Sequence, residues 1–143
     1  MQEADLLRFV TAWPNYLYIA VACASGAMLI WPMLRSGAGG TSVSTLEATL
    51  LINQQNAMVL DVRESAEYEK GHILGARNLP LAHLDARAGD FDKHKAKPVI
   101  VVCGTGERSG KAAAILRRQG FQQVSTLSGG VGAWRQAGLP LEK

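Results

Sequence analysis

Hydrophobic and polar positions divide the chain into a long apolar run near the N-terminus and shorter alternating segments after it. No charged residue occurs between Phe9 and Leu34. As a helix, the apolar stretch at 16–34 is long enough to cross a hydrocarbon core about 30 Å thick. Trp13 and Trp31 lie near its two ends, as expected for rings at membrane interfaces. We therefore predict an N-terminal tail at 1–13 and a transmembrane helix at 14–34.

A cleaved signal peptide is the main alternative for this segment, because small residues at 22–24 would suit a cleavage site. The acidic residues Glu3 and Asp5 in the leader, and the continuation of the apolar run, favour a retained anchor. Arg8 and Arg35 flank the run, so the positive-inside bias leaves its orientation open. Since a reactive thiol stays reduced more easily in the cytoplasm, we expect a single-pass protein of a bacterial inner membrane whose domain faces the cytoplasm.

The composition changes to small, flexible residues at 35–42, which predicts a linker before a domain at 43–143. Within that domain, continuous apolar runs alternate with segments of helical pattern. The expected strands are 57–62, 98–103 and 123–127, and the expected helices are 45–55, 65–71 and 109–120. Parallel strands need crossover connections, which are usually helical, so this alternation predicts an α/β domain with a mainly parallel sheet covered on both faces.

Length, charge and cysteine content exclude several classes of protein. The 143 residues leave room for one domain of about 100 residues and a short appendage, not for a second catalytic domain. The 15 basic and 12 acidic residues do not cluster as a nucleic-acid interface would, so no nucleic-acid partner is expected. With Cys23 and Cys103 as the two cysteines, neither a disulfide framework nor a zinc site is expected.

Cys103 is the candidate nucleophile because it stands where a buried strand gives way to a loop, and ligands of parallel α/β sheets bind beyond that end of the strands. The loop CGTGERS contains Gly104 and Gly106, which allow backbone N–H groups to converge on a small anion. The N-terminus of the following helix and Arg108 would both favour the thiolate. A buried structural cysteine is the alternative, and the glycine cradle with Arg108 argues against it.

Loop length separates two thiolate chemistries. Attack on a sulfane sulfur gives a persulfide, whereas phosphatases and arsenate reductases attack an oxyanion centre. Four residues separate Cys103 from Arg108, one fewer than in the phosphatase type of loop. The shorter loop would form a tighter ring of backbone around the thiolate, which favours a site for one sulfur atom.

Three segments in order resemble the rhodanese family: LDVRESAEYEKGHILGARNLP at 60–80, VIVVCGTGERS at 99–109 and GGVGAWRQAGLPLEK at 129–143. The resemblance implies a single doubly wound rhodanese-like domain and a thiosulfate sulfurtransferase-like enzyme that uses no metal or organic cofactor. Cys103 would accept sulfur as a persulfide from a small anionic donor and pass it to a thiol, cyanide or protein acceptor. The apolar run at 14–34 lies outside the resemblance and would supply the membrane contact.

The same resemblance implies roles for individual residues. The catalytic residue would be Cys103, and the substrate-binding residues would be Gly104, Thr105, Gly106, Glu107, Arg108 and Ser109. Asp61 and Arg63 would support the loop, or each would be purely structural. His72, Trp134 and Pro140 match the family pattern as packing residues.

Two departures from the family pattern concern the donor. Gly104 replaces a side chain that is often larger or basic, and the charge of Glu107 would oppose an anionic donor if it pointed inward, which would make thiosulfate a poor substrate. The alternative function is a membrane-tethered protein-binding or redox-sensing module with little turnover. The oligomeric state is left open.

Overall fold

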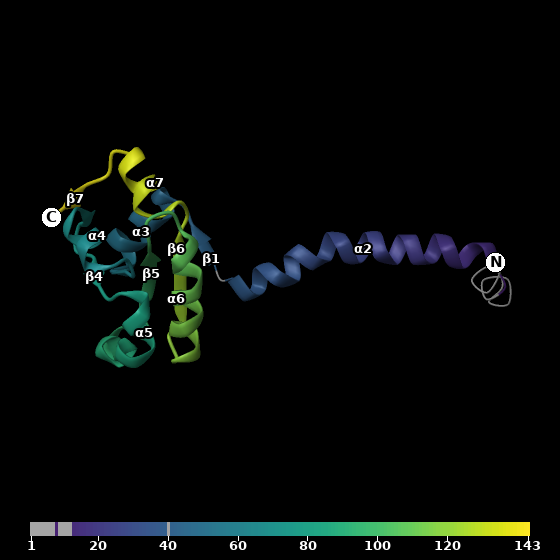
Figure 1. Ribbon diagram of the computed structural model, residues 1–143, viewed down its shortest axis with the longest axis horizontal. Helices are drawn as coiled ribbons and strands as arrows, with labels where there is room; N and C mark the ends of the chain where they lie inside the picture. Colours follow the sequence, from purple (N-terminus) through teal and green to yellow (C-terminus); the bar gives the residue numbers. More distant parts are fainter. Residues whose placement is uncertain (1–7, 9–12, 40) are drawn as a thin grey trace. The chain divides into compact units, whose positions relative to one another are not determined.

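The computed structural model describes residues 8, 13–39 and 41–143, which belong to two compact units (Figure 1). The first unit is Met1–Ala38 and the second is Gly39–Lys143. The N-terminal unit contains most of helix α2 (Trp13–Gly39), and the C-terminal unit contains the sheet and its helices.

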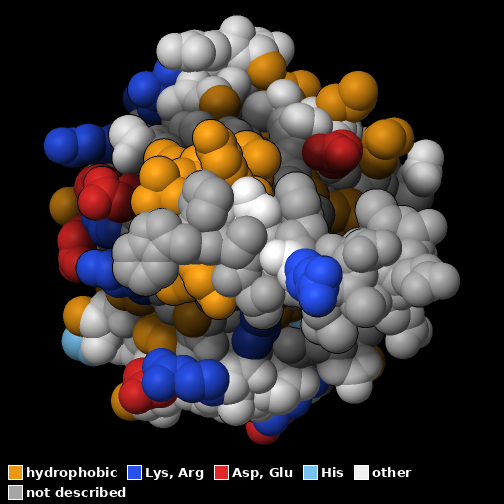
Figure 2. Space-filling view, turned by 90° about the vertical axis from the view of Figure 1, so that its right-hand side faces the viewer, with side chains coloured by type: hydrophobic (Ala, Val, Ile, Leu, Met, Phe, Trp, Pro, Cys, Tyr) orange, Lys and Arg blue, Asp and Glu red, His pale blue; other side chains and the backbone are white. Residues whose placement is uncertain are grey.

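Helix α2 covers the segment 14–34, and many of its large apolar side chains are exposed. Figure 2, viewed from the right-hand side of Figure 1, shows exposed hydrophobic side chains in orange. Within the described ranges, however, no helix combines the length and the hydropathy needed to cross a membrane. The prediction of a transmembrane helix at 14–34 is therefore not supported.

The main sheet of the C-terminal unit has five strands, all parallel, in the order β1-β6-β5-β2-β4. Its strands are β1 (Thr41–Val43), β2 (Met58–Asp61), β4 (Arg77–Asn78), β5 (Pro98–Val102) and β6 (Gln123–Leu127). Two further short strands, β3 (His72–Ile73) and β7 (Leu141–Glu142), form a separate antiparallel pair. The prediction of an α/β domain with a parallel sheet is confirmed.

Helices connect the strands and cover the sheet. They are α3 (Thr45–Gln55), α4 (Ser65–Glu69), α5 (Leu81–Arg87), the 3-10 helix η1 (Ala88–His94), α6 (Glu107–Arg118) and α7 (Gly130–Gln136). The predicted helix at 45–55 has the observed bounds of α3, because Ser44 and Glu47 form a capping box at its start. Helix α6 starts two residues before the predicted 109, so the loop after Cys103 is shorter than the sequence indicated.

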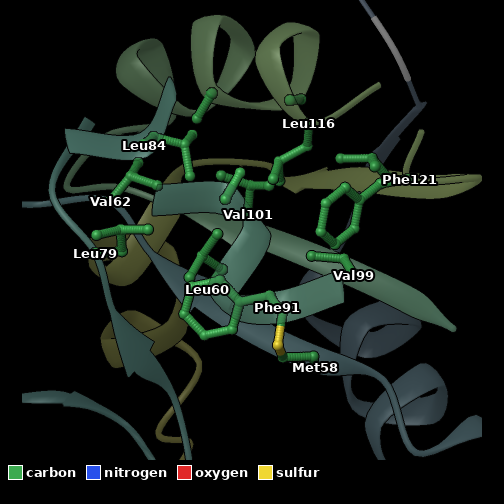
Figure 3. Close-up of a cluster of buried hydrophobic side chains, with 14 of the residues drawn as sticks. Met58, Leu60, Val62, Leu79, Leu84, Phe91, Val99, Val101, Leu116 and Phe121 are labelled. Atoms are coloured by element: carbon green, nitrogen blue, oxygen red, sulfur yellow. The ribbon is translucent and has the colours of Figure 1, made fainter. Parts of the chain in front are cut away.

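Alternate residues of the central strands enter two hydrophobic cores, which shows that both faces of the sheet are buried. Met58 and Leu60 of β2 lie in one core, and Val59 between them lies in the other. The first core, drawn in Figure 3, also contains Leu84 of α5 and Leu116 of α6. The second contains residues of α3 and α7, with Trp134 among them. This double coverage is why the strand runs are continuously apolar.

Candidate active site

Cys103 follows the last residue of β5, and 1% of its surface is exposed. Strand β5 lies at the centre of the sheet, where it pairs with β6 on one side and with β2 on the other. The backbone N–H of Gly106 donates a hydrogen bond to Cys103 Sγ at 2.9 Å. The loop therefore folds back over the sulfur, and a backbone donor is aimed at the atom on which negative charge would develop.

The glycine at 106 allows the chain to turn directly from this loop into α6. Gly106 has φ +99, a conformation that side chains other than glycine rarely adopt, and it is the N-cap of the helix. The Ser109 hydroxyl donates to the Gly106 carbonyl at 2.7 Å and closes the turn. The positive end of the α6 dipole thus lies beside the thiol.

Helix α7 fixes the other side of the loop through its backbone. The N–H of Val131 donates to the Cys103 carbonyl at 2.9 Å, and the N–H of Gly132 donates to the Gly104 carbonyl at 3.2 Å. Gly130, at φ +60, lies so close that an added Cβ would collide with the Cys103 carbonyl. The sequence interpretation missed this contact. The glycine doublet at 129–130 after a predicted strand was the signal for it.

Arg108 is placed at the loop as expected, but its guanidinium is paired. Arg108 Nη1 and Nη2 donate to Glu67 Oε2 and Oε1, each at 2.9 Å, from helix α4. Both side chains are partly exposed, at 39% for Arg108 and 41% for Glu67. Hydrogen bonds from Arg108 lower the pKa of Glu67 to about 2, and the same bonds raise the pKa of Arg108. Glu67 lies 41 residues away from Arg108 in the sequence, and sequence reasoning did not single it out.

Asp61 and Arg63 form a second ion pair, at the end of β2, and this pair is buried. Arg63 Nη2 lies 2.7 Å from Asp61 Oδ2, and the two residues are 6% and 1% exposed. Arg63 Nη2 also donates to the Gly71 carbonyl at 2.8 Å. Of the two roles that the sequence left open, these contacts favour the structural one, because they hold the Arg63 guanidinium inside the domain.

The other predicted site residues lie around the loop at different depths. Ser109 is buried, Gly104 is partly buried, and Thr105 and Glu107 are exposed. The exposed position of Glu107 places it at the surface of the loop. His72 stacks on Tyr68, with ring centroids 3.6 Å apart. Its contacts are those of the packing residue that the sequence indicated.

The C-terminal segment is tied back to the domain. Trp134 Nε1 donates to the Pro140 carbonyl at 3.0 Å, and Trp134 is 4% exposed. In the part of the chain that the structure describes, no group of three His, Cys, Asp or Glu side chains is arranged to bind a metal ion.

The sequence profile of the rhodanese-like domain matches residues 44–137, which include both ion pairs and the whole Cys103 loop. The chain belongs to the rhodanese-like domain family. Relatives extend the likeness: the uncharacterized protein YibN of Escherichia coli K12 is 45% identical over 142 residues, 99% of this chain and 97% of YibN. Thiosulfate sulfurtransferase GlpE of Coxiella burnetii is 38% identical over 93 residues, 65% of this chain and 85% of GlpE.

Solved structures of rhodanese-like proteins share the fold. Thiosulfate sulfurtransferase from Pseudomonas aeruginosa matches with a TM-score of 0.65 and 28% identity, over 72% of this chain and 20% of that one. The Alr3790 protein from Anabaena matches with a TM-score of 0.64 and 31% identity, over 70% and 79% of the two chains. The rhodanese-like domain of this chain thus has sulfurtransferases among its relatives, together with proteins whose activity is not named.

Proposed function

We propose that this rhodanese-like domain is a sulfurtransferase that carries sulfur as a persulfide on Cys103. The observation that supports this most directly is the hydrogen bond from the Gly106 N–H to Cys103 Sγ at 2.9 Å, within a short loop that ends at the N-terminus of α6. Such a donor and dipole stabilise negative charge on the Cys103 sulfur, which favours the thiolate that attacks the donor. The sulfurtransferase names among the relatives agree with this chemistry.

The proposed reaction has two transfer steps. The Cys103 thiolate attacks the outer sulfur of thiosulfate, a new S–S bond forms, and the old S–S bond breaks with its electron pair leaving on sulfite. The outer sulfur of the persulfide is then attacked by an acceptor. Cyanide leaves as thiocyanate, whereas a small thiol or a protein thiol leaves as a persulfide, and the Cys103 thiolate is regenerated. No oxidant or reductant is consumed, which agrees with a site built from one cysteine.

The residues around Cys103 divide into two roles under this proposal. Gly104, Thr105, Gly106, Glu107, Arg108 and Ser109 form the ring that receives the transferred sulfur. Asp61 and Arg63 support the neighbouring strand end from inside the domain. Because Cys103 itself is 1% exposed, the donor has to present its terminal sulfur end-on through this ring.

Mass spectrometry of the intact chain tests the proposal. After incubation with thiosulfate and removal of excess donor, the wild-type protein should gain about 32 Da, one sulfur atom, and cyanide should remove it. Cys103→Ser keeps the size of the side chain and should gain nothing. Cys23→Ser is the matched control and should behave as wild type. A gain of sulfur by Cys103→Ser would disprove the assignment, and no gain by any variant with several sulfane donors would favour a binding module.

A further inference from the structure

The Arg108 guanidinium is held by Glu67 directly beside the residue that follows Cys103. Two parallel hydrogen bonds of 2.9 Å join the guanidinium to both carboxylate oxygens, the geometry that fixes an arginine most firmly. Arg108 Nη2 lies 3.5 Å from the position that a Cβ would take on Gly104. The ion pair therefore lies in van der Waals range of the residue that follows Cys103.

Acidic groups predominate among the charges that act on Arg108. The groups that raise the pKa of Arg108 by their charge are Glu67, Cys103 and Glu64, all of them anionic when ionised. Arg63 also acts on Glu67, but its own guanidinium is bound to Asp61. Both arginines next to the loop thus have a carboxylate partner, and Glu107 adds a further acidic group on the exposed side.

We propose that Glu67 is a positioning residue that ties up the Arg108 guanidinium and thereby selects sulfur donors of low negative charge over the thiosulfate dianion. This inference rests on the sulfurtransferase function proposed above and adds the class of donor. Monoanionic thiosulfonates, and persulfides of small or protein thiols in their neutral form, are the donors that the site favours. A neutral persulfide would transfer its outer sulfur and proton to the Cys103 thiolate while the donor thiolate leaves with the electron pair of the broken bond.

Electrostatics gives the reason for the selection. An unpaired guanidinium at the ring would attract a dianion twice as strongly as a monoanion at the same distance. The carboxylate of Glu67 cancels that attraction, and it cancels twice as much for the dianion. Removal of the Glu67 charge should therefore improve binding of thiosulfate more than binding of a donor with one charge.

The test compares thiosulfate with benzenethiosulfonate, which offers the same terminal sulfur with one charge less, in the full chain with cyanide as acceptor. Glu67→Gln keeps the length of the side chain and removes its charge. We expect the ratio of kcat/KM for thiosulfate to kcat/KM for benzenethiosulfonate to rise about fivefold, mostly through a lower KM for thiosulfate. Glu67→Asp retains the charge and should stay within about twofold of wild type. An equal change for both donors, or no change, would overturn the proposal.

A second measurement does not depend on how well the variants fold. In the wild-type protein, a neutralised ring should make kcat/KM for thiosulfate nearly independent of salt as the Debye length falls from about 30 Å to about 3 Å. A steep fall with salt would mean that an unpaired cation attracts the donor, and would contradict the role of Glu67. Wild type that gains sulfur from neither donor would disprove the sulfurtransferase function itself, whereas sulfur gain with an unaltered donor ratio in Glu67→Gln would disprove this inference alone.

Discussion

The ends of strands β2 and β5 lie side by side in the sheet, where Asp61 is the register partner of Val102, and each end is followed by an arginine. The two arginines differ in burial and in their partners. At β2 the arginine is Arg63, which is buried with Asp61 and bound to the Gly71 carbonyl. At β5 the arginine is Arg108, which lies at the surface and pairs with Glu67 from another helix.

The backbone of the two strand ends is also held differently. After β2, the Leu79 N–H donates to the Asp61 carbonyl at 3.0 Å, and the Asn78 side chain adds hydrogen bonds to the carbonyls of Asp61 and Arg63 at 3.1 and 2.9 Å. After β5, the carbonyls of Cys103 and Gly104 accept hydrogen bonds from backbone N–H groups of α7. The difference is that side chains add to the backbone contacts after β2, whereas glycines allow α7 to approach the chain closely after β5. Under the proposed function, the β5 end is the one that carries the reactive side chain.

Gly130→Ala gives the largest expected effect, because it disrupts the backbone contacts between α7 and the loop after β5. The new Cβ would collide with the Cys103 carbonyl and approach the Gly104 carbonyl at 2.7 Å, at φ +60 where alanine is strained. We expect a loss of about 4 kcal/mol in the free energy of unfolding, measured by urea denaturation, and loss of sulfur transfer. In the control Gly132→Ala the added Cβ makes an ordinary contact of 3.5 Å. Equal stability of the two variants would show that α7 does not hold the loop.

The sequence predicted elements that carry a complete local pattern better than it predicted the shortest elements. The helix at 45–55 and the strand at 123–127 were predicted with their observed bounds, since each carries a complete local pattern. Strands β3, β4 and β7 have two residues each, too few to show periodicity. Helix α7 has seven residues and begins with a glycine, which weakens its helical pattern.

The candidate site divides in the same way. Cys103, Gly106 and Arg108 are neighbours in sequence, so their pattern alone predicted them close together, although Arg108 belongs to the first turn of α6. Glu67 and the Gly130 backbone reach the loop from α4 and α7, and only the fold brings them there. The pairing of Arg108 was therefore not predicted, although a bidentate partner determines what its guanidinium can bind.

Replacing each arginine by methionine tests whether the two ion pairs differ as described. Arg63→Met would leave the Asp61 carboxylate buried without its cation, so we expect a loss of about 3 kcal/mol in the free energy of unfolding. Arg108→Met, the matched change at the surface pair, should cost less than about 1 kcal/mol, because Glu67 can be solvated. The Arg63→Met protein that still folds should have the wild-type KM for thiosulfate. Arg108→Met should have a higher KM for thiosulfate than wild type. A reversed order of stability would contradict the assignment of Arg63 as the structural arginine.

The smallest expected effect is the pH dependence of the surface pair. The folded chain keeps Glu67 charged to a pKa of about 2, whereas the unfolded value is near 4.5, so the unfolded state takes up the proton first as the pH falls. The contribution of the pair to stability is therefore complete above 4.5 and is lost between 4.5 and about 2. Solvent screening keeps it below about 1 kcal/mol, since Glu67 is 41% exposed. The stabilities of wild type and Glu67→Gln, measured by acid denaturation, should converge across this window. A gap between wild type and Glu67→Gln that persisted at pH about 2 would mean that the carboxylate stabilises the domain by packing instead of by its charge.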